Sequence, residues 1–163
     1  TTLFRSVNIQ YSPETTALET AGGIATALPL LGETPFLVVN GDVWCDWDFK
    51  QGTALSDRLN AEKKLAWLLL VPNPEHHPSG DFGLGANEIV SEVGAPRLTF
   101  AGIGLYQPGL FAHTPAGQPA KLAPLLRVAM TQQKVLGTQH AGRWVDVGTP
   151  ERLSELNHQL GHA

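Results

Sequence analysis

The order of apolar and polar positions predicts strands alternating with helices. Residues 35–40 and 64–71 are continuous apolar runs, which are typical of strands buried on both faces of a sheet. Within residues 19–31 and 122–130, apolar side chains recur every three or four positions, which predicts two helices. The other expected elements are strands at residues 7–11, 82–84, 88–93, 98–106, 135–140 and 143–147, and a helix that Thr149 caps and Pro150 begins.

This alternation indicates an α/β protein with a Rossmann-like, mostly parallel mixed sheet that helices cover on both faces. The short strands within residues 80–106 are expected to form its antiparallel part. Residues 1–6 carry no strand or helix signal, so we expect an unstructured or non-native lead followed by a single domain over residues 7–163. A doubly wound domain normally begins with a strand and a phosphate-binding turn. The sequence contains no such turn.

Composition narrows the classes of function. Apolar residues make up 42% of the chain and charged residues 16%, which is enough for a packed core. The net charge is −4 and there is no basic run, so a nucleic-acid surface is not expected. Cys45 is the only cysteine, which excludes an internal disulfide and fits a reducing compartment. Because no signal-peptide pattern or membrane-length apolar run occurs, we expect a cytoplasmic protein without membrane contact.

A carboxylate follows the first buried strand. The run over residues 35–40 leads directly into Asn40-Gly41-Asp42. Ligands of open α/β sheets bind beyond the carboxyl ends of strands, and a carboxylate there can hold a divalent cation against a phosphate. Asn-Gly is also a strong hairpin signal. Since the residues after it do not mirror the apolar run, we favour Asp42 as a site residue.

A second carboxylate, Asp146, ends the strand before the last expected helix. Asp42 and Asp146 can reach one point if their strands are neighbours. Mg²⁺ needs few protein ligands because it keeps several of its waters. We therefore expect a Mg²⁺ site between the two aspartates. In the alternative interpretation, Asp146 caps the following turn or pairs with Arg143.

Other candidate residues give weaker signals. Gly22 and Gly23 lie in the first turn of an expected helix, where free N–H groups can approach a ligand closely. Lys121 could meet a phosphate as a point charge, although a lysine before a helix is common. His76 and His77 supply at most two metal ligands, whereas a zinc site needs three or four. A solvated loop is the better interpretation of these histidines.

Asp46-Trp47-Asp48 is a D-x-D triplet. Such pairs hold a metal and a nucleotide diphosphate in many glycosyltransferases, which consume a UDP-sugar and release UDP. Three-residue matches are frequent by chance, so solvated acids are the more common explanation. A glycosyltransferase using Asp46 and Asp48 stays open as the alternative enzyme, and an inactive sugar-nucleotide binder as the alternative without catalysis.

Six segments together resemble the sugar-1-phosphate nucleotidyltransferases, over most of the chain from Val7. The HH-x-x-GDF loop and the KLAPLL helix are most similar to the members that act on N-acetylmuramate 1-phosphate. The resemblance implies a nucleotide-binding α/β fold and transfer of a uridylyl group from UTP to a sugar 1-phosphate, as in peptidoglycan recycling. The segments are LETAGGIATALPLLG (18–32), FLVVNGDVW (36–44), NPEHHPSGDFGL (73–84), LTFAGIGLY (98–106), KLAPLLRVAM (121–130) and RWVDVGTPERL (143–153).

The resemblance also implies roles for individual residues. Asp42 and Asp146 match two family aspartates that hold Mg²⁺. Lys121 is not assigned by the resemblance and is our own candidate for a further phosphate contact during catalysis. Gly22 and Gly23 match the backbone that packs beside the base. Gly83, Glu92 and Gly102 fall where the family lines the sugar pocket. We also count Glu19, Asn40 and Asp81 as candidates for substrate binding.

Two motifs of the family do not occur in this sequence. The family has a G-x-G-T-R-type loop that cradles the triphosphate, and a P-K-P lysine that contacts the sugar phosphate. We therefore expect the chain to be the C-terminal portion of such an enzyme, with little or no turnover of its own. A missing first strand would leave a sheet edge exposed, which favours homodimerisation or other self-association.

Overall fold

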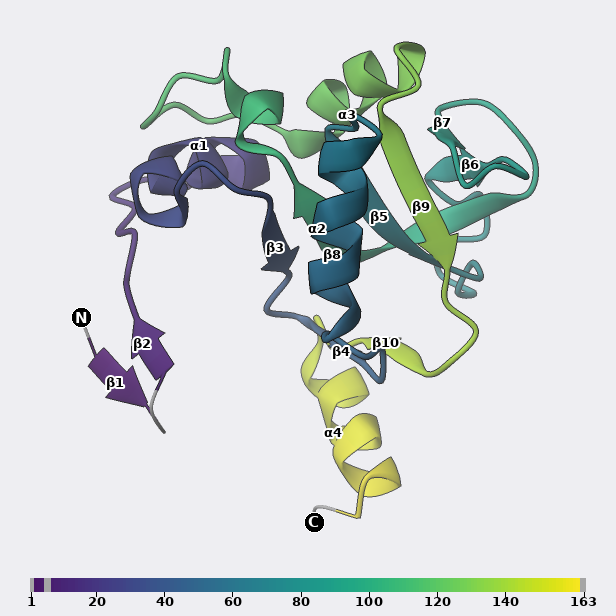
Figure 1. The fold of residues 1–163 in the computed structure, drawn as a ribbon. Helices are drawn as coiled ribbons and strands as arrows, with labels where there is room; N and C mark the ends of the chain where they lie inside the picture. Colours follow the sequence, from purple (N-terminus) through teal and green to yellow (C-terminus); the bar gives the residue numbers. More distant parts are fainter. Residues whose placement is uncertain (1, 5–6, 162–163) are drawn as a thin grey trace.

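The computed structural model describes residues 2–4 and 7–161, and its main element is a mixed sheet with helices on both faces (Figure 1). The strands of this sheet are β3 (Phe36–Val39), β5 (Ala66–Val71), β6 (Phe82–Leu84), β7 (Val90–Ser91), β8 (Arg97–Tyr106) and β9 (Val135–Gln139). The helices are α1 (Glu19–Leu31), α2 (Gln51–Ala61), α3 (Leu122–Thr131), α4 (Pro150–Gln159) and the short 3₁₀ helix η1 (Pro108–Phe111).

β8 is the centre of the sheet because it pairs along both of its edges. One edge pairs antiparallel with β5, and the other pairs antiparallel with β3 and, further along, with β6. β5 pairs parallel with β9. The α/β class with a mixed sheet is therefore confirmed, but parallel pairing in the described strands is limited to β5 and β9. β8 lies between β3 and β5 and runs opposite to both, which periodicity cannot reveal.

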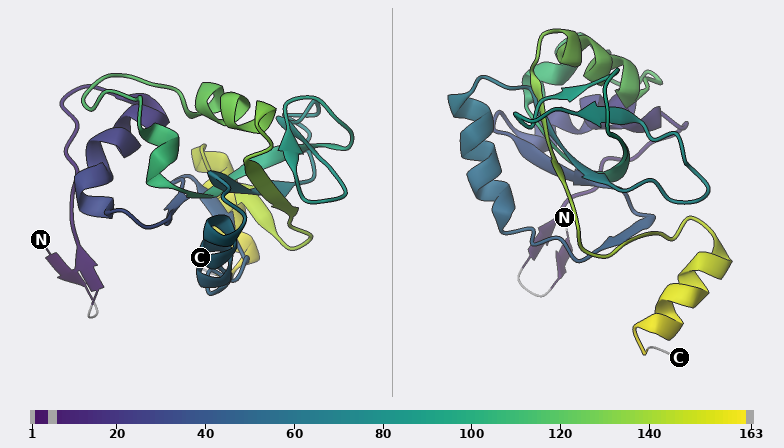
Figure 2. Two further views of the ribbon diagram at one scale, coloured as in Figure 1. Left: turned by 45° about the horizontal axis from the view of Figure 1, so that its top comes forward. Right: turned by 90° about the vertical axis from the view of Figure 1, so that its right-hand side faces the viewer.

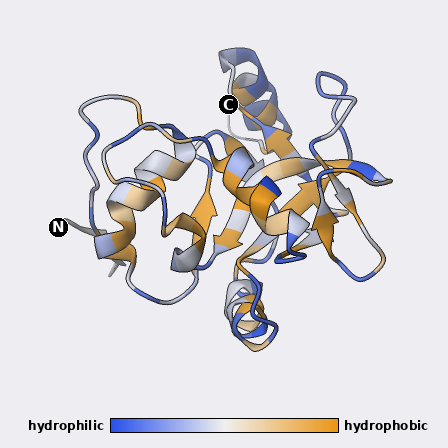
Figure 3. Ribbon diagram, turned by 90° about the horizontal axis from the view of Figure 1, so that it is seen from above, coloured by the Kyte–Doolittle hydropathy of each residue, from blue (hydrophilic) through white to orange (hydrophobic). Residues whose placement is uncertain are grey.

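β5 shows why helices are needed on both faces of the sheet. All six of its side chains are buried. The side chains of Ala66 and Leu68 join a core with Leu126 of α3, whereas Trp67 joins a second core with Leu59 of α2. Figure 2 shows α2 on the opposite side of the sheet from α1 and α3, and Figure 3 shows the hydrophobic residues gathered in the strands. Burying a large apolar side chain contributes about 1.5–3 kcal/mol.

Three elements differ from the expectations. β1 (Thr2–Phe4) pairs antiparallel with β2 (Val7–Ile9), where a lead without structure was expected. Residues 1, 5, 6, 162 and 163 lie outside the described residues. Helix α2 was not predicted, because Leu55 and Leu59 are its only large apolar residues and no side chain caps its N-terminus. A single domain over residues 7–163 stays a prediction.

The third difference is a separate two-stranded sheet, which we call the β4–β10 ribbon. It consists of β4 (Val43–Cys45) and β10 (Trp144–Asp146), which pair antiparallel. The last helix, α4, follows directly, and the Thr149 hydroxyl accepts a hydrogen bond from Arg152 N–H, which confirms the predicted cap. No helix among residues 2–4 and 7–161 combines the length and the apolar character that a membrane crossing requires.

Candidate functional site

The β4–β10 ribbon brings the two predicted carboxylates together. Val43 pairs with Asp146, and Val147 N–H donates to the Asp42 carbonyl at 2.8 Å. Both carboxylates approach Gly148: a Cβ built there would lie 3.0 Å from Asp146 Oδ1 and 3.7 Å from Asp42 Oδ2. Because Gly148 has no side chain, the space next to both oxygens stays open. The two carboxylates therefore lie beside the same backbone position.

Asp42 and Asp146 also line one cavity of about 320 Å³. A second cavity of about 370 Å³ adjoins it, since the walls of both include Asn40, Asp81 and Phe100. We call the two cavities together the acidic cleft. It contains seven of the predicted site residues: Glu19, Asn40, Asp42, Asp81, Gly102, Lys121 and Asp146.

Gly102 shows why a glycine is needed in this cleft. Its φ is +74°, a conformation that favours glycine, and a Cβ on Gly102 would lie only 3.0 Å from Nδ2 of the Asn40 side chain. Asn40 N–H donates to the Gly102 carbonyl at 2.8 Å. The close approach of these two residues fixes the end of β3 just before Asp42.

Two predicted residues pack within the fold rather than lining the acidic cleft. Gly22 N–H donates to the Ala120 carbonyl at 3.1 Å, and a Cβ on Gly22 would overlap the Gln118 carbonyl. A Cβ on Gly23 would lie 2.6 Å from Glu14 Oε1. Their small size therefore has a packing reason, and the predicted contact with a base stays a prediction.

Two further predicted residues also lie outside the walls of the acidic cleft. Gly83 is in β6, where a Cβ would lie 2.8 Å from Gly94 Cα. Glu92 forms an ion pair with Arg127, with 2.9 Å between Oε1 and Nε. The structure thus gives both residues structural partners, and their predicted sugar contacts remain untested.

Asp146 has three partners. Gly148 N–H donates to its Oδ1 at 2.8 Å, Arg152 Nη1 lies 2.5 Å from its Oδ2, and His76 Nε2 lies 3.5 Å from the same oxygen. Partial burial alone would raise the pKa of Asp146. The hydrogen bonds from Gly148 and Arg152 and the nearby charges outweigh burial and lower that pKa. The expected turn cap is present, but the cationic partner is Arg152 and not Arg143.

The sequence-based interpretation missed His76 and His77 as site residues. Both line the first cavity of the acidic cleft, although their loop was expected only to be solvated. His77 Nε2 lies 3.0 Å from Asp81 Oδ1, and Asp81 Oδ2 accepts a hydrogen bond from Phe100 N–H at 2.8 Å. The four-residue spacing between His77 and Asp81 is the signal that could have revealed this contact.

The D-x-D aspartates have separate structural partners. Asp46 Oδ1 accepts from Arg143 N–H at 2.9 Å and lies 2.6 Å from His140 Nε2, and these hydrogen bonds lower the pKa of Asp46. Asp48 Oδ1 accepts from Lys50 N–H at 3.0 Å at the start of α2. Neither carboxylate lines the acidic cleft. The glycosyltransferase alternative therefore has no support.

The fold and this site define a class of protein. The sequence matches the Nucleotidyl transferase family over residues 2–162, and the chain belongs to this family. The resemblance found in the sequence is thereby confirmed, and the class is that of nucleotidyltransferases acting on sugar 1-phosphates.

Two curated relatives share one name, N-acetylmuramate alpha-1-phosphate uridylyltransferase. The chain is 54% identical to that of Neisseria meningitidis serogroup B over 158 residues, and 34% identical to that of Caulobacter vibrioides over 154 residues. These matches cover 95% and 90% of this chain but 68% and 63% of the relatives. The chain thus spans about two thirds of the length of these relatives.

Solved structures show the same fold. A UDP-glucose pyrophosphorylase from Acinetobacter baumannii superimposes with a TM-score of 0.70 at 18% identity, covering 98% of this chain and 63% of that chain. A UDP-glucose pyrophosphorylase complexed with UDP-glucose gives a TM-score of 0.66 at 16% identity, covering 91% and 64%. At these identities the likeness establishes the fold alone.

Proposed function

We propose that this chain supplies the Mg²⁺ site and the sugar-phosphate pocket of a cytoplasmic uridylyltransferase, which makes UDP-N-acetylmuramate from UTP and N-acetylmuramate 1-phosphate in peptidoglycan recycling. The proposal depends on one observation: the carboxylates of Asp42 and Asp146 both approach Gly148 at one end of the β4–β10 ribbon. The names of the two curated relatives support the choice of substrates.

The reaction needs no nucleophilic side chain. A phosphate oxygen of the sugar 1-phosphate attacks the α-phosphorus of UTP, the bond from that phosphorus to the bridging oxygen breaks, and pyrophosphate leaves. Two carboxylates beside an open cavity fit Mg²⁺, which prefers oxygen ligands and keeps waters. Bound there, Mg²⁺ would neutralise phosphate charge. Asp42 and Asp146 would hold it.

Residues of the second cavity fit the other parts of the substrates. Lys121 immediately precedes α3 and lines this cavity together with Glu19 and Asn40. Its ammonium group is the point charge that we assign to a substrate phosphate. Glu19 and Asn40 offer a carboxylate and an amide to hydroxyl groups of the sugar or the ribose.

The two histidines fit the distinctive group of N-acetylmuramate. This sugar carries a lactyl carboxylate that N-acetylglucosamine lacks. Among the residues that line the first cavity, His76 and His77 are the only ones that can carry a positive charge. We therefore assign the lactyl carboxylate to this histidine pair, with His77 oriented by its contact with Asp81.

The test is an assay of the purified chain with UTP, Mg²⁺ and N-acetylmuramate 1-phosphate. Pyrophosphate release is expected to be slow or absent, because the G-x-G-T-R loop does not occur in this sequence. Calorimetry is expected to show UTP binding that depends on Mg²⁺. Rapid turnover would contradict the expected impairment. Failure to bind UTP with Mg²⁺, together with failure to react, would contradict the proposed function.

Self-association also remains a prediction. Among the described strands β3 pairs only with β8, so its other edge is open, and Val39 there is exposed. Open strand edges are templates for pairing with another chain. Light scattering of the purified chain is expected to show a dimer or larger species. A monodisperse monomer would contradict this expectation.

A further inference from the structure

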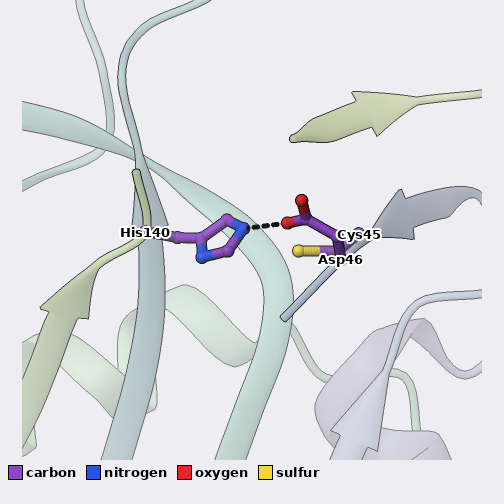
Figure 4. A group of neighbouring side chains, drawn as sticks. All are labelled: Cys45, Asp46 and His140. Atoms are coloured by element: carbon purple, nitrogen blue, oxygen red, sulfur yellow. Dashed lines mark hydrogen bonds and ion pairs between the residues drawn. The ribbon is translucent and has the colours of Figure 1, made fainter. Parts of the chain in front are cut away.

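A second group of metal-ligand side chains lies at the end of β4 that is remote from Asp42. Cys45 ends β4, Asp46 follows it, and His140 follows β9 (Figure 4). One ligand atom from each residue lies within 4.8 Å of the other two. In the described part of the chain, this is the only such group of three or more potential ligands. None of the three lines the acidic cleft.

The surroundings leave room for an ion at this group. A Cβ built on Gly142 would overlap Asp46 Oδ1 and would lie 2.6 Å from His140 Nε2, so the absence of a side chain there keeps the space open. The His140 side chain is mostly buried and that of Asp46 is half-exposed, which gives solvent access from one side. Arg143 N–H donates to Asp46 Oδ1 and fixes the carboxylate.

We propose that Cys45, Asp46 and His140 form a zinc site distinct from the Mg²⁺ site. Thiolate, imidazole and carboxylate are all zinc ligands, and three protein ligands leave a fourth position for water. A thiolate disfavours Mg²⁺, which prefers oxygen donors. Zinc would take the place of the hydrogen between Asp46 Oδ1 and His140 Nε2, which lie 2.6 Å apart, with His140 bound as neutral imidazole protonated at Nδ1. The thiol proton of Cys45 would be released to solvent.

Zinc here would brace the ribbon that carries the proposed catalytic aspartates. Cys45 belongs to β4, whereas His140 lies in the connection from β9 to β10. Zinc would then tie β4 to the connection that leads into β10, at the end of the β4–β10 ribbon opposite to Asp42 and Asp146. An ion that binds only the folded chain raises its melting temperature with increasing free ion concentration.

The decisive probe is Co²⁺ added to the metal-free full chain. Because Cys45 is the only cysteine, a thiolate-to-cobalt charge-transfer absorption reports on this residue alone. We expect this absorption in the parent chain, its loss in Cys45→Ser, and its displacement by Zn²⁺. The readout does not require UTP binding or turnover, so it is independent of the proposed function.

Variants separate a three-ligand site from a lone thiol. His140→Gln is expected to weaken zinc affinity at least tenfold in a chelator-competition titration, since loss of even an outer-shell partner costs about 10–100-fold. His113→Gln, which changes an exposed histidine elsewhere, is the matched control and should leave affinity unchanged. Circular dichroism verifies that each variant is folded. Absence of the absorption in the parent chain, or unchanged affinity in His140→Gln, would overturn the proposal and leave the Asp46–His140 contact as a hydrogen bond only.

Discussion

Asp42 and Asp146 lie at the same end of the β4–β10 ribbon, but the chain holds their side chains differently. Asp42 lies in the exposed turn after β3, and no residue within 2–4 and 7–161 donates a hydrogen bond or an ion pair to its carboxylate. Asp146 is half-buried and contacts Gly148, Arg152 and His76. One carboxylate is therefore free for a cation, whereas the other is already oriented and paired with Arg152.

The fold therefore orients Asp146 before any ligand binds. Arg152 belongs to the first turn of α4, whose start is fixed by the Thr149 cap. The last helix thus positions the cation that orients Asp146. A bound Mg²⁺ would have to share Asp146 with Arg152, whereas none of the described residues would compete with it for Asp42. Variants at the two positions should consequently behave differently.

Among the variants, Asp42→Asn should reduce turnover and Mg²⁺-dependent UTP binding most strongly. Loss of a ligand to a charge-neutralising metal removes several kcal/mol of transition-state stabilisation, which corresponds to about a thousandfold decrease in rate. We expect turnover to fall by that factor, or Mg²⁺ stimulation of UTP binding to disappear where turnover is too slow to measure. The free energy of unfolding should change little, because the Asp42 carboxylate has no hydrogen-bond or ion-pair partner in the described part of the chain.

Asp57→Asn is the control for this variant. Asp57 is an exposed acid on α2, outside the acidic cleft, so its substitution changes net charge equally without touching the site. If Asp42→Asn retains activity and Mg²⁺ dependence within a few fold of the parent, Asp42 is not a metal ligand.

The next strongest effect is expected for His77→Gln, which should distinguish N-acetylmuramate 1-phosphate from N-acetylglucosamine 1-phosphate. His77→Gln removes the imidazole that we assign to the lactyl carboxylate, and hydrogen bonds to charged groups contribute about 1.5–3 kcal/mol. We expect binding of N-acetylmuramate 1-phosphate to weaken by about tenfold or more. Binding of N-acetylglucosamine 1-phosphate, which lacks this carboxylate, is the internal control and should not change. Equal weakening of both ligands would show that His77 acts only through the loop structure.

Much of the fold follows from local patterns in the sequence. The predicted range of α1 is confirmed at residues 19–31, α3 ends one residue later than expected, and the Thr149 cap is present. Regular apolar spacing marks α1 and α3, and Thr149 with Pro150 marks the start of α4. α2 has only two large apolar residues, so its existence depends on packing against the sheet.

The site was predicted only in part, for a related reason. A strand end rich in small residues marks Asp42, and a strand before a capped helix marks Asp146. The pairing of Val43 with Asp146 depends on the packing of segments about a hundred residues apart, which no local pattern contains. The contacts of Arg152 with Asp146 and of His77 with Asp81 depend in the same way on how loops and helices close over the sheet.

A smaller effect should appear when the competing cation is removed. Arg152→Met keeps a long side chain but removes the guanidinium group from Asp146 Oδ2, which leaves His76 as the remaining neighbour of that oxygen. A partly exposed pair contributes up to about 1 kcal/mol, which is about fivefold in a binding constant. We expect affinity for Mg²⁺, measured by calorimetry with UTP present, to rise up to about fivefold. Weaker Mg²⁺ binding would mean that Arg152 serves the site mainly by orienting Asp146.

The smallest effect concerns the stability that the contacts of Asp146 provide in acid. The pKa of Asp146 is lowered in the fold, whereas an unfolded aspartate titrates at about 3.9. The stabilisation is therefore present above about pH 4 and is lost as the pH falls towards the folded pKa, with a size below about 1 kcal/mol. Urea unfolding at a series of pH values should show the gap between the parent chain and Asp146→Asn closing as the solution is acidified. Arg152→Met should give an intermediate slope, because the hydrogen bond from Gly148 remains. A gap that is independent of pH would mean that the asparagine disturbs packing, and that the carboxylate's contacts contribute no stability.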